Sequence, residues 1–221
     1  MKQIWHNNGL SITLFGLFLI TQIGLSVVGY YHHNDEQTQH RRPQISFIAY
    51  LMSPAFLEAT AENWESEFLQ MCAYVVLTTF LYQKGSAESK KLDEPEPVDR
   101  DPRSATEKEG VPWPVKKGGV TLKLYECSLS LALFSLFAIS FVWHAWSGSR
   151  EYSNQELAHG GAAVTTLQYI ATSQFWFESL QNWQSEFLSI GVMVLLSIFL
   201  RQRGSPESKP VDAPHWQTGS E

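Results

Sequence analysis

The chain has 221 residues, of which 44% are apolar, and its formal net charge is −6. This length allows one domain or two small ones, and no basic stripe with interleaved aromatic residues supports nucleic-acid binding. The averages hide a pattern, because the apolar residues gather in four blocks and the charged residues lie between them.

The four blocks span residues 10–30, 68–82, 124–146 and 187–200. At about 1.5 Å per residue, the first and third cover the roughly 30 Å hydrocarbon core of a bilayer. The second and fourth, with 15 and 14 residues, are several ångströms shorter. A bilayer admits only helices or closed barrels, and no strand alternation is visible. We therefore predict an all-α polytopic membrane protein with four transmembrane helices, the first of which is retained rather than cleaved as a signal peptide.

The segments between the blocks show weaker patterns. Residues 44–60 and 164–180 have apolar residues at roughly helical spacing, and Pro54 interrupts the first of them. We expect each to be an amphipathic helix on the outer membrane surface or over the bundle, and a re-entrant pair is the alternative. Residues 31–40, which are rich in histidine and acids, are expected to be a solvated loop, with a metal site as the alternative.

A shift of 119 residues superimposes the chain on itself. Of the 28 positions from Asn63 to Lys90, 16 are identical to those 119 residues later, and the same offset pairs Tyr50 with Tyr169. One constant offset indicates an internal duplication. Each copy is predicted to be a helical hairpin. The two tandem hairpins would be related by a pseudo-twofold axis along the membrane normal.

The duplication sets the expected domains. We predict a first repeat over residues 1–90, a flexible cytoplasmic linker over 91–119, a second repeat over 120–209 and a disordered tail over 210–221. The linker is rich in Pro, Glu, Lys and Asp and has too little apolar surface to fold. Lys and Arg gather beside the linker and the tail, whereas the opposite loops carry only Arg41, Arg42 and Arg150. Both termini are therefore expected in the cytoplasm.

Two long motifs occur once in each half. NWESEF starts at Asn63 and NWQSEF at Asn182, and they are followed by GSAESK from Gly85 and GSPESK from Gly204. In these motifs the chain resembles a family of bacterial integral membrane proteins that is defined only as a domain of unknown function. The resemblance implies a multi-pass protein of the bacterial inner membrane, and it implies no activity, cofactor or catalytic residue.

Each NWxSEF motif places a glutamate immediately before an apolar run. One interpretation is a helix start, in which Asn63 and Asn182 are N-caps, the glutamates favour the helix dipole, and Trp64 and Trp183 are anchors at the membrane interface. The alternative is a polar or ion site, in which two glutamates meet across the axis and hold a cation or share a proton. The candidate site residues are Glu67, Glu186, Asn63, Asn182, Ser66, Ser185, Tyr50 and Tyr169.

No phosphate-binding loop, nucleophile elbow or metal-ligand motif is present in the sequence. We therefore expect no catalytic residues, no resident metal, no cofactor and no enzymatic activity. The leading hypothesis is a membrane scaffold or complex-associated protein, whose partners are the lipid bilayer and either a second copy or another membrane protein. The alternative is a small proton or cation channel or transporter that uses Glu67 and Glu186.

Overall fold

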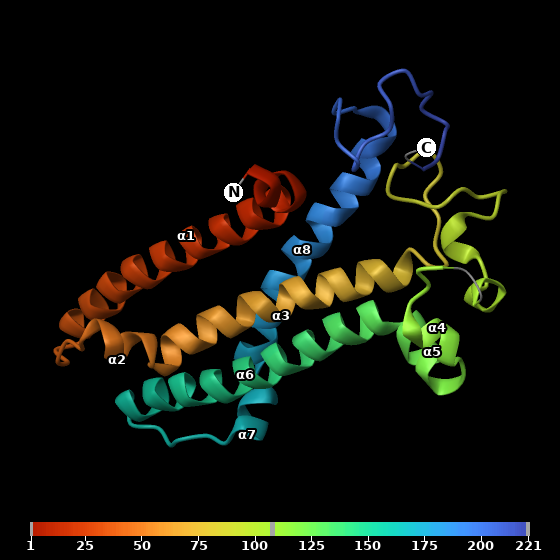
Figure 1. The fold of residues 1–221 in the computed structure, drawn as a ribbon. Coiled ribbons are helices and arrows are strands. Elements are labelled where there is room, and N and C mark those ends of the chain that lie inside the picture. Colours follow the sequence, from red (N-terminus) through yellow and green to blue (C-terminus); the bar gives the residue numbers. More distant parts are fainter. Residues whose placement is uncertain (1, 107–108, 220–221) are drawn as a thin grey trace. The chain divides into compact units, whose positions relative to one another are not determined.

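The computed structural model describes residues 2–106 and 109–219, and every regular element in these residues is a helix. The predicted all-α class is therefore confirmed. The elements labelled in Figure 1 are α1 (Lys2–Gln39), α2 (Phe47–Leu51), α3 (Pro54–Leu77), α4 (Trp113–Lys117), α5 (Gly119–Glu126), α6 (Ser128–Ala158), α7 (Thr166–Ile170) and α8 (Ser173–Phe199). Two short 3₁₀ helices, Pro97–Asp99 and Pro102–Ala105, lie between α3 and α4.

Within the described residues, three helices are long and apolar enough to cross a membrane. They are α1, α6 and α8, with candidate spans Gln3–Gln39, Ser128–Ala158 and Ser173–Phe199. Many of their large apolar side chains are exposed, which is the arrangement that lipid rather than a protein core would cover. The first, third and fourth apolar blocks of the sequence fall largely in these helices.

The second block, residues 68–82, does not form a membrane-length apolar helix, so the structure bears out three of the four predicted spans by length and composition. Helix α3 ends at Leu77, and residues 78–80 form a turn. The helix instead extends backwards to Pro54, and its 24 residues include four glutamates. Because of these glutamates, α3 differs in composition from the three candidate spans.

The prediction of one long outer helix over residues 44–60 and another over residues 164–180 was wrong. Each segment contains a five-residue helix, α2 or α7, followed by the first turns of α3 or α8. Pro54 is the first residue of α3 rather than an interruption, because a helix leaves the first N–H groups without intrahelical partners and proline lacks one.

The loop predicted over residues 31–40 is mostly helical, because α1 continues to Gln39. Side chains four residues apart support this extension. His32 lies 3.5 Å from the carboxylate of Glu36, and Gln37 is hydrogen-bonded to His33 at 3.1 Å. Pairs at this spacing face each other on a helix and stabilise it.

The chain divides into two compact units. The first unit combines the chain up to Ala61 with Trp143–Ala171, and the second combines Glu62–Val142 with the chain from Thr172 onwards. Helices α3 and α6 each contribute residues to both units. Each unit therefore combines residues from both halves of the sequence.

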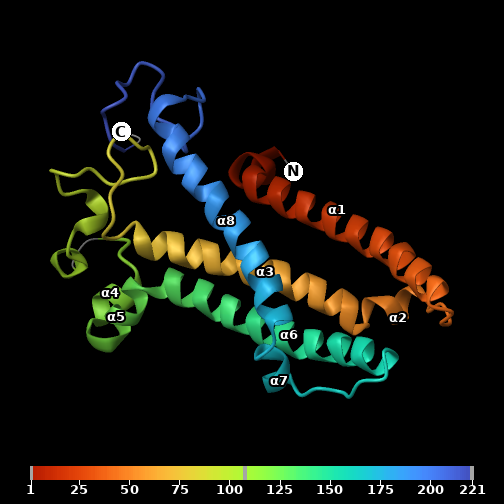
Figure 2. The ribbon, with the colours of Figure 1, turned by 180° about the vertical axis from the view of Figure 1, so that it is seen from behind.

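In the first unit, α1 and α6 are tied to the loops that follow them by the same contact. The Asn34 side chain exchanges hydrogen bonds of 2.9 and 3.1 Å with the backbone of Ile45. At positions 119 residues later, the Ser153 hydroxyl exchanges bonds of 3.0 and 3.2 Å with the backbone of Val164. Figure 1 shows α1 leading into α2, and Figure 2 shows α6 leading into α7. The bonded residues Ile45 and Val164 immediately precede Ser46 and Thr165, the N-caps of α2 and α7.

In the second unit, two turns at residues 85–90 and 204–209 share one geometry. Gly85 and Gly204 have the same φ of 87°, a conformation that favours glycine. The hydroxyls of Ser89 and Ser208 each accept a hydrogen bond of 2.9 Å from the backbone N–H six residues earlier. The two GSxESK motifs are therefore the same structural turn.

The final residues of the described chain contact the first of these turns. Thr218 accepts a hydrogen bond from the backbone N–H of Gly85 at 2.9 Å, and the N–H of Gly219 donates to the carbonyl of Ser86 at 2.9 Å. The Lys209 ammonium also donates to the carbonyl of Gly85, at 2.5 Å. The segment predicted as a disordered tail thus makes specific hydrogen bonds in the second unit.

Candidate functional site

The two glutamates singled out by the sequence lie on α3 and α8 in the second unit. The side chain of Glu67 is exposed and that of Glu186 is half-buried. The charge of Glu67 acts on Glu186 as a smaller influence than the burial of Glu186 itself. The meeting of the two carboxylates in a polar site stays a prediction.

The predicted N-cap role of the two asparagines was wrong. Asn63 and Asn182 lie well inside α3 and α8, whose first residues are Pro54 and Ser173. The N-cap of α8 is Thr172, whose side chain accepts a hydrogen bond from the N–H of Phe175. The apolar runs are thus the second parts of longer helices, and both asparagines lie on interior turns of those helices.

The serines of the two motifs have the same local partner. Ser66 donates to the carbonyl of Asn63 at 2.9 Å, and Ser185 donates to the carbonyl of Asn182 at 2.8 Å. Serine commonly returns its hydroxyl to the preceding turn of its own helix in this way. These bonds explain both serines without a ligand.

Two glutamates of α3 accept hydrogen bonds from α8. The Asn182 side-chain amide donates to the carboxylate of Glu62, and the Trp183 indole N–H donates to the carboxylate of Glu65 at 3.0 Å. The side chain of Glu65 is fully buried. Trp183, predicted as an interface anchor, thus makes a hydrogen bond between helices, and Trp64 is half-buried in α3.

A third polar residue of α3 extends this contact by two turns. The Gln70 side-chain amide donates to the carbonyl of Glu186 at 2.9 Å and to the hydroxyl of Ser189 at 3.3 Å. Glu62, Glu65 and Gln70 lie within nine residues of α3, and each is hydrogen-bonded to α8. We refer to this set as the α3–α8 seam; it comprises Glu62, Glu65, Gln70, Asn182, Trp183 and Ser189.

Glu62, Glu65 and Gln70 were not predicted as site residues, because the candidates were residues that are identical in the two halves. At the matching positions the second half has Gln181, Gln184 and Ser189. The seam therefore depends on differences between the halves. The signal that could have found it is the presence of three long polar side chains within nine residues of one predicted helix.

In the first unit, each predicted tyrosine lies against a glycine of a long helix. Tyr50 of α2 and Tyr169 of α7 are both buried. A Cβ atom on Gly29 would overlap the Tyr50 hydroxyl, and one on Gly148 would lie 2.6 Å from the Tyr169 ring. Gly29 and Gly148 are also 119 residues apart, so the offset that paired the tyrosines could have identified these glycines.

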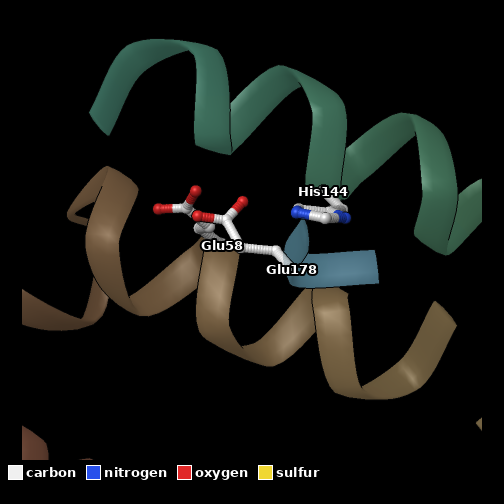
Figure 3. Close-up of side chains that lie close together, drawn as sticks. All are labelled: Glu58, His144 and Glu178. Carbon is white, nitrogen blue, oxygen red and sulfur yellow. The ribbon is translucent and has the colours of Figure 1, made fainter. Parts of the chain in front are cut away.

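Of these two tyrosines, only Tyr169 belongs to a polar cluster among the residues that the structure describes. The Tyr169 hydroxyl donates to the carboxylate of Glu58 at 3.0 Å. His144 is fully buried, and one of its ring nitrogens lies within 4.8 Å of a Glu58 carboxylate oxygen. Figure 3 shows Glu58 on α3 and His144 on α6; it also labels Glu178 of α8, which belongs to the second unit.

The Glu58, Tyr169 and His144 cluster combines three groups that can exchange protons. Carboxylate oxygen and imidazole nitrogen are also ligands for zinc and for other transition metals. A zinc site uses three or four protein ligands, and Glu58 and His144 supply two. The chemistry that this cluster can perform within its unit is therefore binding or transfer of a proton.

Comparison with known proteins gives a match to a family model. No curated protein and no solved structure matches the chain. The family model described as Domain of unknown function (DUF6766) matches residues 1–220. This match confirms the resemblance to an uncharacterised family, and the chain belongs to that family.

Proposed function

We propose that the protein is a multi-pass protein of a bacterial inner membrane, built from two tandem helical hairpins and acting as a non-enzymatic scaffold. In this topology α1, α3, α6 and α8 all cross the bilayer. The termini and the linker lie in the cytoplasm in this topology. The lysines and arginines near these helix ends support that side, because cytoplasmic loops carry an excess of positive charge.

The duplication within this proposal is supported by contacts that recur at one offset. The reciprocal bonds of Asn34 with Ile45 and of Ser153 with Val164 lie 119 positions apart. The glycine–tyrosine contacts and the two GSxESK turns recur at the same offset. Positions that are 119 residues apart thus make the same local contacts, both in the loop of each proposed hairpin and in the turn that follows it.

The inclusion of α3 as a membrane span is supported by where its polar groups lie. With 24 residues, α3 is about 36 Å long, which exceeds the roughly 30 Å hydrocarbon core. Glu62 and Glu65 accept hydrogen bonds from α8 instead of facing outwards. Ionisable residues within a membrane span are expected to face the bundle interior and to be paired there.

The observation that carries the scaffold proposal is the α3–α8 seam. Its carboxylates and amides are engaged in hydrogen bonds between helices, so they hold the two helices together. In a bilayer no hydrophobic effect drives helices together, and such bonds and close packing determine their association. The exposed apolar faces of α1 and α6 are then available to lipid and to a membrane-protein partner or second copy.

Cross-linking in native membranes tests the scaffold proposal. The wild-type chain is expected to give a cross-linked complex of reproducible composition by mass spectrometry. Glu65→Leu leaves the Trp183 indole N–H without its acceptor, which costs about 1–3 kcal/mol, and should weaken that complex. Glu36→Gln, an exposed change in α1, is the matched control. A wild-type chain that cross-links to no protein contradicts the proposal.

The charge of Glu67 acts on Glu186, and this interaction favours a second candidate function, a small proton or cation channel or transporter. Two neighbouring carboxylates can hold a cation or share a proton. In proteoliposomes, this function predicts a proton or potassium flux that Glu67→Gln combined with Glu186→Gln abolishes and that Glu36→Gln leaves intact. Folded wild-type protein without flux of any ion tested rejects this candidate.

A further inference from the structure

A short helical hairpin lies immediately before α6 in the second unit. Helices α4 and α5 pack against each other, and the turn between them is formed by Gly118 and Gly119, whose φ values of 67° and 61° favour glycine. Only Cys127 separates α5 from the first residue of α6. The α4–α5 hairpin, residues 113–126, is therefore held next to a candidate membrane span.

The hairpin has one buried and one exposed apolar side. Val115 and Leu122 are buried. Trp113, Val120 and Leu124 are 64%, 73% and 56% exposed. Val120 and Leu124 are four residues apart and so share one face of α5. An apolar face remains outside the unit after the hairpin has packed.

The charge of the hairpin is opposite to that of the whole chain. Lys116, Lys117 and Lys123 are exposed, and Glu126 is the only acid among residues 113–126, whereas the chain has a net charge of −6. The Lys117 ammonium lies 4.8 Å from the centre of the Trp113 ring. Lysines beside exposed aromatic and aliphatic residues are typical of helices that lie on anionic membranes.

We propose that the α4–α5 hairpin docks on the headgroups of anionic lipids at the cytoplasmic surface of the membrane. The inference rests on the proposed function, since it requires α6 to span the bilayer. Two observations select lipid as the occupant. The hairpin is continuous with the start of α6, so its exposed apolar face is held at the level of the headgroups. Its three lysines are complementary to anionic phosphate, and tryptophan and tyrosine favour the membrane interface.

Hydrogen–deuterium exchange tests this docking. The full chain is reconstituted in nanodiscs of phosphatidylcholine, with or without about one third phosphatidylglycerol, and exchange is followed in peptides that cover residues 113–126. Exchange in these peptides is expected to be at least about fivefold slower when phosphatidylglycerol is present, because ordering on the surface protects the backbone amides. Equal exchange in the two lipid compositions overturns the proposal.

Two variants at the same positions separate charge from folding. The triple change Lys116→Gln, Lys117→Gln and Lys123→Gln is expected to abolish the lipid dependence. The matched change of all three lysines to arginine keeps the charge and is expected to preserve it. Loss of the lipid dependence in both variants overturns a role for charge. Addition of inorganic phosphate to the phosphatidylcholine nanodiscs is expected to give no protection, and protection there identifies a soluble anion as the ligand instead.

The same experiment distinguishes failure of the docking from failure of the membrane proposal. Peptides from α1, α6 and α8 are expected to exchange slowly in both lipid compositions if these helices span the bilayer. Rapid exchange throughout those helices rejects the membrane assignment itself. Slow exchange there, with no effect of lipid on residues 113–126, rejects only the docking.

Discussion

The two GSxESK turns have nearly the same sequence and the same backbone geometry, yet their lysines have different environments. Lys90 forms an ion pair of 2.7 Å with Asp99 near the surface. Lys209 is buried and donates to the backbone carbonyls of Gly85, Pro214, His215 and Gln217. The local sequence therefore determines the turn, whereas the surrounding chain determines the environment of its lysine.

The different environments also appear in the pKa values of the two lysines. The hydrogen bond to Asp99 raises the pKa of Lys90. Burial, followed by the nearby charge of Arg201, lowers the pKa of Lys209. Burial disfavours an ammonium ion, so the carbonyls around Lys209 are needed to hold the charged form in place.

The largest expected effect comes from removal of the buried ammonium. Lys209→Met should lower the free energy of unfolding by about 2–4 kcal/mol, because a charged donor contributes about 1.5–3 kcal/mol per hydrogen bond and buried carbonyls would lose their partner. It should also expose the chain after residue 210 to proteases. Thermal unfolding in detergent and limited proteolysis measure both effects. The matched change Lys90→Met should have a much smaller effect, and equal losses would remove the distinction between the turns.

The second prediction concerns the glycine–tyrosine contacts. Gly148→Ala would place a Cβ atom 2.6 Å from both the Tyr169 ring and the Glu58 carboxylate. Such overpacking should cost about 1–3 kcal/mol in thermal unfolding. Gly29→Ala meets the hydroxyl and ring of one residue, Tyr50, instead of two residues, and should cost less. Gly16→Ala, with no atom within 4 Å of the added Cβ, is the control and should be neutral or slightly stabilising.

The third prediction compares the two tyrosines directly. Tyr169→Phe removes the hydrogen bond to the Glu58 carboxylate and should cost about 1–2 kcal/mol. Tyr50→Phe removes a hydroxyl to which the described residues give no hydrogen-bond partner, and it should change stability by less than about 0.5 kcal/mol. Chemical unfolding of the two variants side by side tests this. A larger loss for Tyr50→Phe would contradict the polar role assigned to Tyr169.

The smallest expected effect is a pH dependence at the first turn. The hydrogen bond from Lys90 lowers the pKa of Asp99. The contribution of this carboxylate to stability is therefore present above its unfolded-state pKa of about 3.9 and is lost as the pH falls through the lower, folded-state value. Asp99→Asn should remove a small part of the acid destabilisation of the chain. Identical acid titrations of the variant and the wild type would contradict this contribution.

The sequence predicted the features that depend on local pattern. The apolar blocks identified α1, α6 and α8, and the constant offset identified Tyr50 and Tyr169 as matching residues. It failed where a distant part of the chain supplies the partner. Glu62 and Glu65 of α3 were given no role. Their partners, Asn182 and Trp183, lie more than a hundred residues away in the sequence, and the hydrogen bonds are visible only in three dimensions.

The start of each long helix shows a second reason for failure. Pro54 was interpreted as an interruption, although proline is also well suited to the first position of a helix. Asn63 and Asn182 suit an N-cap by residue type, but helix α3 starts nine residues before Asn63 and Thr172 caps α8. Residue type alone thus allowed each of these residues to start a helix or to lie elsewhere. The first residues of α3 and α8 in the structure decide between the two interpretations.

The number of membrane crossings is the most direct test of the proposed architecture. Reporter fusions that are active on only one side of the inner membrane can be attached separately to the N-terminus and the C-terminus of the full chain. If α3 crosses the bilayer together with α1, α6 and α8, both termini report the cytoplasm. If only the three apolar helices cross, the termini report opposite sides, and that result would contradict the paired-hairpin topology.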